Sequence, residues 1–101
     1  MKYNKLVRDK IPEIIKGKGE TPITHIADNQ EYEIKLKEKL KEEVEEFLKE
    51  SNAEELADIL EVIYAIRDNM GVSREELEKI RLEKSEKRGG FKGTIILDET
   101  E

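Results

Sequence analysis

Apolar residues recur every three or four positions along two central segments of the chain, as in amphipathic helices. In the first segment, from about residue 30 to about residue 50, these positions are Leu36, Leu40, Val44, Phe47 and Leu48. In the second segment, which ends near Met70-Gly71, they are Leu56, Ile59, Leu60, Ile63 and Ile66. If the two helices pack through these apolar stripes, they form an antiparallel hairpin.

The beginnings of three helices carry the same capping signature, a Ser or Asp followed three residues later by Glu. The signature occurs at Asp28/Glu31, Ser51/Glu54 and Ser73/Glu76. The last of them predicts a helix that runs to about Lys87 and stops at Gly89-Gly90. A short helix is expected over about 9–16, with Pro12 in its first turn, where a missing N–H does no harm.

Two segments rich in β-branched residues predict short strands. They are TPITHI at 21–26 and GTIIL at 93–97, which can pair with each other. A chain of 101 residues forms one domain. The expected fold is therefore mainly α, a helical bundle over 1–101 with short terminal β-strands.

The second long helix is apolar beyond its stripe, because Ala57, Val62, Tyr64 and Ala65 extend the apolar face around the cylinder. A helix that is apolar on most sides is buried on most sides. The other elements of one subunit are too few to cover it. We therefore expect a homo-oligomer built on helix packing.

Composition excludes several classes of function. The net charge of −6 argues against a nucleic-acid duplex as partner. The chain has no cysteine, which excludes disulfides, thiolate zinc sites and cysteine nucleophiles. No apolar run is long enough to span a membrane. The N-terminal MKYNKLVRDKIP lacks the apolar stretch of a signal peptide, so a cytoplasmic location is expected.

Two acidic pairs, Glu43/Glu46 and Glu55/Asp58, lie on the borders of the two apolar stripes. Residues three apart share a helix face, so a hairpin can bring four carboxylates into one groove. Four such groups repel each other unless a cation lies among them, and oxygen ligands suit Mg²⁺, with Mn²⁺ as an alternative. The other interpretation is a solvated helix face, because Asp and Glu together number 25 and Glu42/Glu45 shows the same spacing by chance.

An anionic substrate needs cations near such a groove. Candidates for binding phosphate lie near the N-terminus, at Lys5, Arg8 and Lys10, and at the end of the last helix, at Lys84, Lys87 and Arg88. The alternative is that these side chains complement the helix dipole and keep the chain soluble. That alternative is favoured for Lys87.

The sequence Glu42-Glu43-x-x-Glu46, followed by Glu55-x-x-Asp58, resembles the ExxE…ExxD signature of the all-α nucleotide pyrophosphohydrolases, which include the MazG-like proteins. YNKLVRDKIPEII (3–15) and EKRGGF (86–91) resemble a small MazG-like branch labelled phosphoribosyl-ATP pyrophosphohydrolase-like. The resemblance covers nearly the whole chain, although the interval between Glu46 and Glu55 is shorter than usual.

The resemblance implies that Glu43, Glu46, Glu55 and Asp58 bind Mg²⁺ and that Lys84 and Arg88 engage phosphates. It also implies dimers or tetramers whose sites are partly built from neighbouring subunits. The expected enzyme is a nucleoside triphosphate pyrophosphohydrolase in which Glu42 or Glu46 acts as general base and Arg8 and Lys10 also contact phosphate. The alternatives are phosphoribosyl-ATP hydrolysis in histidine synthesis and a non-catalytic acidic oligomer that binds a nucleotide or a protein.

Overall fold

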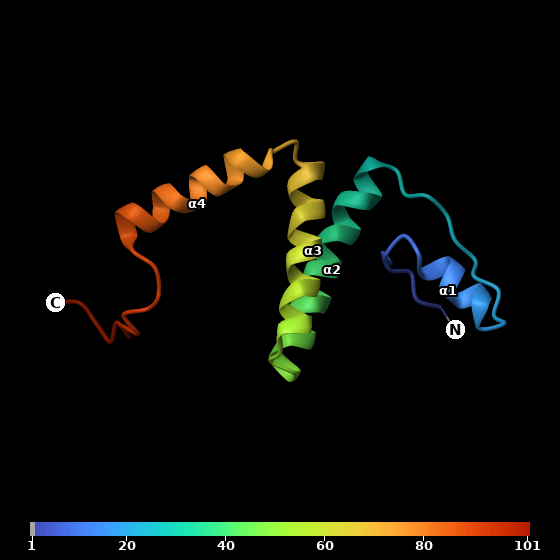
Figure 1. Ribbon diagram of the computed structural model, residues 1–101, viewed down its shortest axis with the longest axis horizontal. Helices are drawn as coiled ribbons and strands as arrows, with labels where there is room; N and C mark the ends of the chain where they lie inside the picture. The colour runs from blue at the N-terminus through green and yellow to red at the C-terminus, as the bar shows by residue number, and fades with distance from the viewer. Residues whose placement is uncertain (1) are drawn as a thin grey trace.

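Two long helices packed as an antiparallel hairpin form the centre of the molecule (Figure 1). The computed structural model describes residues 2–101. The hairpin consists of α2 (Asn29–Lys49) and α3 (Ala53–Asn69). The short α1 (Ile11–Gly17) precedes it and α4 (Arg74–Arg88) follows it. The predicted hairpin and the mainly helical class are confirmed.

Two of the three predicted caps form as expected. The Asp28 carboxylate accepts a hydrogen bond from the Glu31 N–H at 2.8 Å, and the Ser73 hydroxyl accepts one from the Glu76 N–H at 3.1 Å. These contacts satisfy backbone donors that have no partner within the first turn of a helix.

The third predicted cap is wrong by one residue. Asn52, not Ser51, caps α3, and its side-chain oxygen accepts from the Glu55 N–H at 2.9 Å. The Ser51 hydroxyl instead donates to the Phe47 carbonyl at 3.0 Å and so completes the last turn of α2. The connection between the two helices is therefore very short, and Glu55 is held in the first turn of α3.

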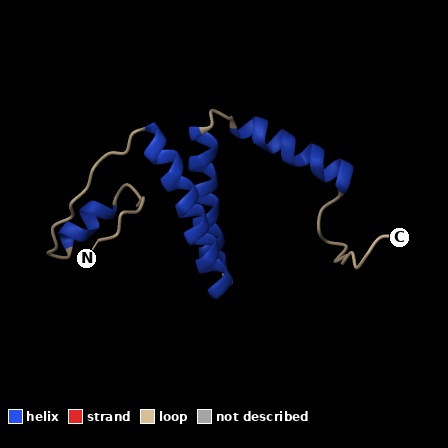
Figure 2. Ribbon diagram, turned by 180° about the vertical axis from the view of Figure 1, so that it is seen from behind, coloured by secondary structure: helices blue, strands red, loops and turns tan. Residues whose placement is uncertain are grey.

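The predicted strands are wrong, because residues 2–101 contain no strand (Figure 2). The segments 21–26 and 93–97 are irregular, and Ile23, Ile26 and Ile95 are 97%, 96% and 86% exposed. The first segment lies between α1 and α2 and the second beyond α4, on opposite sides of the hairpin (Figure 1). Since a strand needs a partner for its backbone groups, β-branched residues alone do not make one.

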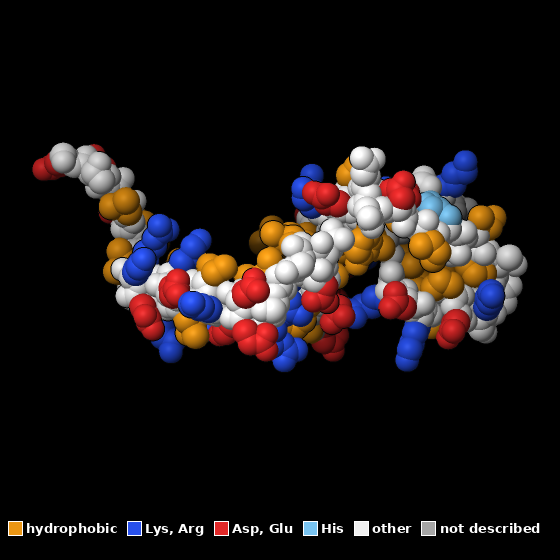
Figure 3. Space-filling view, turned by 90° about the horizontal axis from the view of Figure 1, so that it is seen from above, with side chains coloured by type: hydrophobic (Ala, Val, Ile, Leu, Met, Phe, Trp, Pro, Cys, Tyr) orange, Lys and Arg blue, Asp and Glu red, His pale blue; other side chains and the backbone are white. Residues whose placement is uncertain are grey.

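The packed interior is small and lies within the hairpin. Among the described residues only Leu36 and Val62 are buried. The molecule measures 60 × 31 × 24 Å, and its radius of gyration is 18.0 Å, whereas a compact domain of this length has a radius of gyration of about 13 Å. Helix α4 extends away from the hairpin (Figure 1), and apolar side chains lie at the surface among the charged ones (Figure 3).

None of the helices in residues 2–101 combines the length and the apolar character needed to cross a bilayer.

Candidate metal centre

Three of the four predicted carboxylates converge where α2 faces the first two turns of α3. Glu43 projects from α2, and Glu55 and Asp58 project from α3. One oxygen atom from each lies within 4.8 Å of the other two. All three residues are half-buried. The Asn52 cap fixes Glu55 in the first turn of α3, and Asp58 follows three residues later on the same face.

The pKa of Glu55 is raised by partial burial and by the negative charges around it. Partial burial raises the pKa of this carboxyl above its ordinary value, and the charges of Asp58, Glu46 and Glu43 raise it further, with a smaller effect from Glu50. Each of these influences makes the ionised form of Glu55 less favourable. A divalent cation among these oxygens would reverse that effect, and three carboxylate oxygens are the ligand type that Mg²⁺ and Mn²⁺ prefer.

Glu46 lies outside this group of three. Its side chain is exposed, on the turn of α2 that follows Glu43. It is still close enough for its charge to raise the pKa of Glu55. Its role as a metal ligand stays a prediction, and its position beside the cluster also suits a group that accepts a proton.

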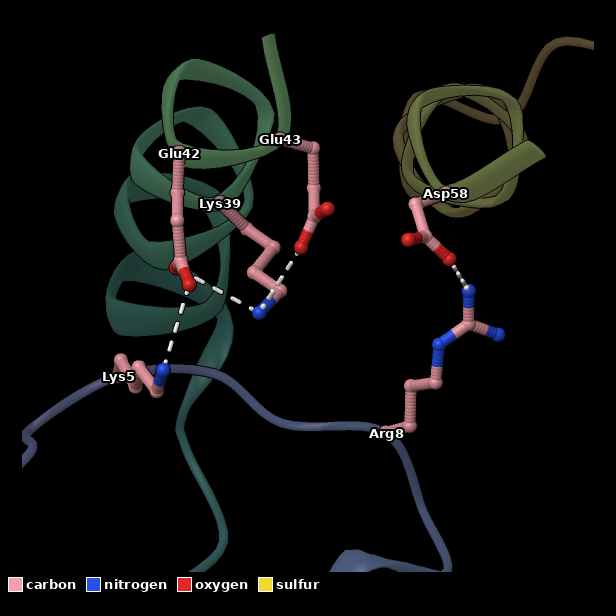
Figure 4. Close-up of polar contacts among 6 residues, drawn as sticks. All are labelled: Lys5, Arg8, Lys39, Glu42, Glu43 and Asp58. Carbon is pink, nitrogen blue, oxygen red and sulfur yellow. Dashed lines mark hydrogen bonds and ion pairs between the residues drawn. The ribbon is translucent and has the colours of Figure 1, made fainter. Parts of the chain in front are cut away.

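Lysine and arginine side chains neutralise part of this charge (Figure 4). The Arg8 Nη2 donates to Asp58 Oδ1 at 2.7 Å. The Lys39 Nζ lies 3.3 Å from a Glu43 oxygen and 3.5 Å from a Glu42 oxygen. Figure 4 shows the second Asp58 oxygen turned toward Glu43, across the space between the two helices.

Glu42, the other predicted base, is held by two ammonium groups. Lys39 contacts one of its oxygens, and the Lys5 Nζ donates to the other at 3.3 Å. Both oxygens of Glu42 are therefore engaged in ion pairs. Glu46, which makes no ion pair in the described part of the chain, is therefore the better candidate base.

The predicted phosphate-binding residues are not gathered in one place. Arg8 reaches the cluster, whereas Lys10 is the exposed residue that precedes α1. Lys84 and Arg88 are exposed in the last turns of α4, which leads away from the hairpin (Figure 1). Within one chain, Arg8 is therefore the member of the predicted set that contacts the cluster of Glu43, Glu55 and Asp58, while Lys5 contacts the neighbouring Glu42.

The sequence interpretation missed Lys39. This side chain is only 16% exposed and bridges two consecutive glutamates from the preceding turn of its own helix. The sequence spacing could have predicted these two ion pairs. Lys39 is three residues before Glu42 and four before Glu43, and residues at these spacings are neighbours on a helix surface.

Comparison of the chain with models of protein families, with curated proteins and with solved structures gives no match.

Proposed function

We propose that the protein is a Mg²⁺-dependent nucleotide pyrophosphohydrolase. Its reaction would cleave the α–β phosphoanhydride of a canonical or non-canonical nucleoside triphosphate, giving a monophosphate and pyrophosphate. The observation that carries the proposal is the convergence of the Glu43, Glu55 and Asp58 oxygens from two helices. The resemblance of the acidic signature and its flanks to MazG-like proteins supports the substrate class.

The proposed chemistry assigns a role to each residue at the cluster. Glu43, Glu55 and Asp58 would hold the cation, which would neutralise phosphate charge and acidify water when bound. Glu46 accepts the proton of the attacking water as the oxygen of that water bonds to phosphorus and the anhydride bond breaks. Arg8 has N–H donors beyond the one given to Asp58, and these suit phosphate oxygens.

The proposed enzyme is a homodimer or homotetramer. The chain exposes 9561 Å², about 1.6 times the roughly 5,900 Å² typical of a compact protein of its mass. A stable interface buries about 1,200–2,000 Å² in total, which is less than the surface by which this chain exceeds a compact protein of its mass. Leu60 of α3 and Leu82 of α4 are 46% and 47% exposed and would be covered by a second copy.

Self-association also bears on the position of Lys84 and Arg88. In one chain the two side chains lie on a helix that leads away from the acidic cluster. In the proposed oligomer, α4 of one subunit would bring them to the cluster of its neighbour. Sedimentation of the protein at micromolar concentration tests this part, and a monomer would contradict it.

The activity is tested by offering the protein a panel of nucleotides with Mg²⁺ or with a chelator. The panel contains canonical and modified nucleoside triphosphates together with phosphoribosyl-ATP, and the products are separated by chromatography. Equal amounts of monophosphate and pyrophosphate that appear only with the cation support the proposal. Turnover of phosphoribosyl-ATP alone would assign the pathway substrate, and binding without turnover would make the protein a nucleotide-binding oligomer instead.

A further inference from the structure

The N-terminal segment 2–10, here called the N-terminal strap, crosses the acidic cluster and contacts both helices of the hairpin. The Lys35 Nζ donates to the Asn4 carbonyl at 2.7 Å, and the Lys5 Nζ donates to Glu42 at 3.3 Å, so this end is attached to α2. Arg8 is bonded to Asp58 of α3. Figure 4 shows the strap passing below the two helices with Lys5 and Arg8 reaching up to them.

The attachment to α3 depends on charge. Within the described residues the Arg8 side chain makes one hydrogen bond, from one nitrogen, and the side chains of Arg8 and Asp58 are 57% and 39% exposed. Ion pairs of this exposure contribute little to stability and exchange readily with solvent. The bond is favoured here because the negative charge of Asp58 adds to that of Glu43 and Glu55.

A divalent cation in the cluster would weaken the ion pair between Arg8 and Asp58 in two ways. It would neutralise most of the negative charge that attracts Arg8, and its own charge would repel the guanidinium. The coupling is reciprocal, so a group that the cation displaces must also weaken the binding of the cation.

We propose that Arg8 is the internal counter-ion of the carboxylate cluster and that a divalent cation releases it, together with the strap, from Asp58. This proposal rests on the metal site of the proposed function and adds a movable part to it. The released guanidinium becomes available to the phosphates of a substrate, which carry the charge that Asp58 no longer offers.

Another arrangement makes the opposite prediction. Because one Asp58 oxygen faces Glu43 while Arg8 holds the other, Arg8 could stay in place and orient the carboxylate for the metal (Figure 4). An orienting residue strengthens cation binding, whereas a counter-ion weakens it. The sign of the change in affinity on removing Arg8 therefore decides between the two arrangements.

Titration calorimetry with Mn²⁺ at low ionic strength measures that sign on the wild-type protein, Arg8→Gln and Arg74→Gln. Arg74, exposed at the start of α4, makes no ion pair in the described part of the chain, and its replacement removes the same charge far from the cluster. We expect Arg8→Gln to bind Mn²⁺ roughly threefold to tenfold more tightly than the wild type. Arg74→Gln should bind as the wild type does.

Trypsin supplies a second measurement, because the strap contains cleavage sites at Lys2, Lys5, Arg8 and Lys10, of which Arg8→Gln retains the three lysines. Saturating Mn²⁺ should speed cleavage of the strap in the wild type, while Arg8→Gln should be cleaved fast with or without the ion.

The outcomes separate the two proposals. If the wild type binds Mn²⁺ but Arg8→Gln binds it equally or more weakly, or if the ion does not speed cleavage, the counter-ion role is wrong and the metal site stands. If neither the wild type nor Arg8→Gln binds Mn²⁺, the metal site and the counter-ion role are both wrong.

Discussion

Asp58→Asn is the substitution that most directly tests the carboxylate cluster. The change keeps the shape of the side chain and removes one charge from a residue that faces Glu43 and Glu55. It also removes the negative charge of the Arg8 ion pair, although the amide oxygen of Asn can still accept the hydrogen bond. Because that pair is largely exposed, its loss costs about 0–1 kcal/mol of stability, and relief of repulsion within the cluster offsets it. Folding should therefore be nearly unchanged.

The loss of cation affinity follows from the same geometry. Asp58 is 39% exposed, so the dielectric constant of water gives the conservative value for its interactions. Two unit charges about 4 Å apart in water interact by about 1 kcal/mol, so a carboxylate and a divalent ion interact by about 2 kcal/mol. Asp58→Asn should weaken Mg²⁺ at least about 30-fold. With loss of water activation, turnover should fall of order 100-fold, roughly 3 kcal/mol of transition-state stabilisation.

Calorimetry with Mg²⁺ and steady-state hydrolysis of a nucleotide that the wild type cleaves measure the two losses. Glu75→Gln is the matched control, because Glu75 is an exposed acid in the first turn of α4, away from the cluster, and makes no ion pair in the described part of the chain. Normal Mg²⁺-dependent hydrolysis by Asp58→Asn would refute the reasoning and reduce the acidic pairs to a solvated helix face.

Two further predictions concern stability without metal. The raised pKa of Glu55 means that its ionisation destabilises the fold, so Glu55→Gln and the wild type should melt alike below the ordinary value near 4.5. As the pH rises through the raised pKa, Glu55→Gln should become more stable than the wild type. A difference in melting temperature between the two proteins that stays constant over that range in scanning calorimetry would contradict this prediction. Asn52→Ala should lower the free energy of unfolding by about 1 kcal/mol in urea; an equal loss in Ser51→Ala would contradict the assignment of the cap.

The parts of the fold that could be predicted are those with a local signal. The capping sequences at Asp28 and Ser73 specify where two helices begin, because the side chain and the N–H that it accepts from are only three residues apart. The Ser51 prediction failed for the same local reason. Ser51 and Asn52 are both good caps, and the short connection uses one to end α2 and the other to begin α3.

The acidic cluster was predictable in part because helix periodicity and hairpin packing determine where its side chains lie. The three-residue spacing puts Glu55 and Asp58 on one face, and the apolar stripes orient that face toward Glu43. The absence of strands at 21–26 and 93–97 was not predictable from composition, since strand formation requires a partner that lies elsewhere in the chain. The bond from Arg8 to Asp58 spans 50 positions, and no periodic pattern in the sequence records it.

The distribution of packing explains why the cluster combines fixed and movable groups. Leu36 and Val62, the buried residues of the described chain, both belong to the hairpin, so the carboxylates stand on the best-packed element of the molecule. Arg8 instead belongs to an irregular segment in which no residue of 2–10 is buried, although Leu6 and Val7 are half-buried, and its ion pairs are exposed. Segments with few buried apolar contacts open at low free energy. We therefore expect a change of charge at the cluster to leave the carboxylates in place and to release the strap, which is held by the weaker contacts.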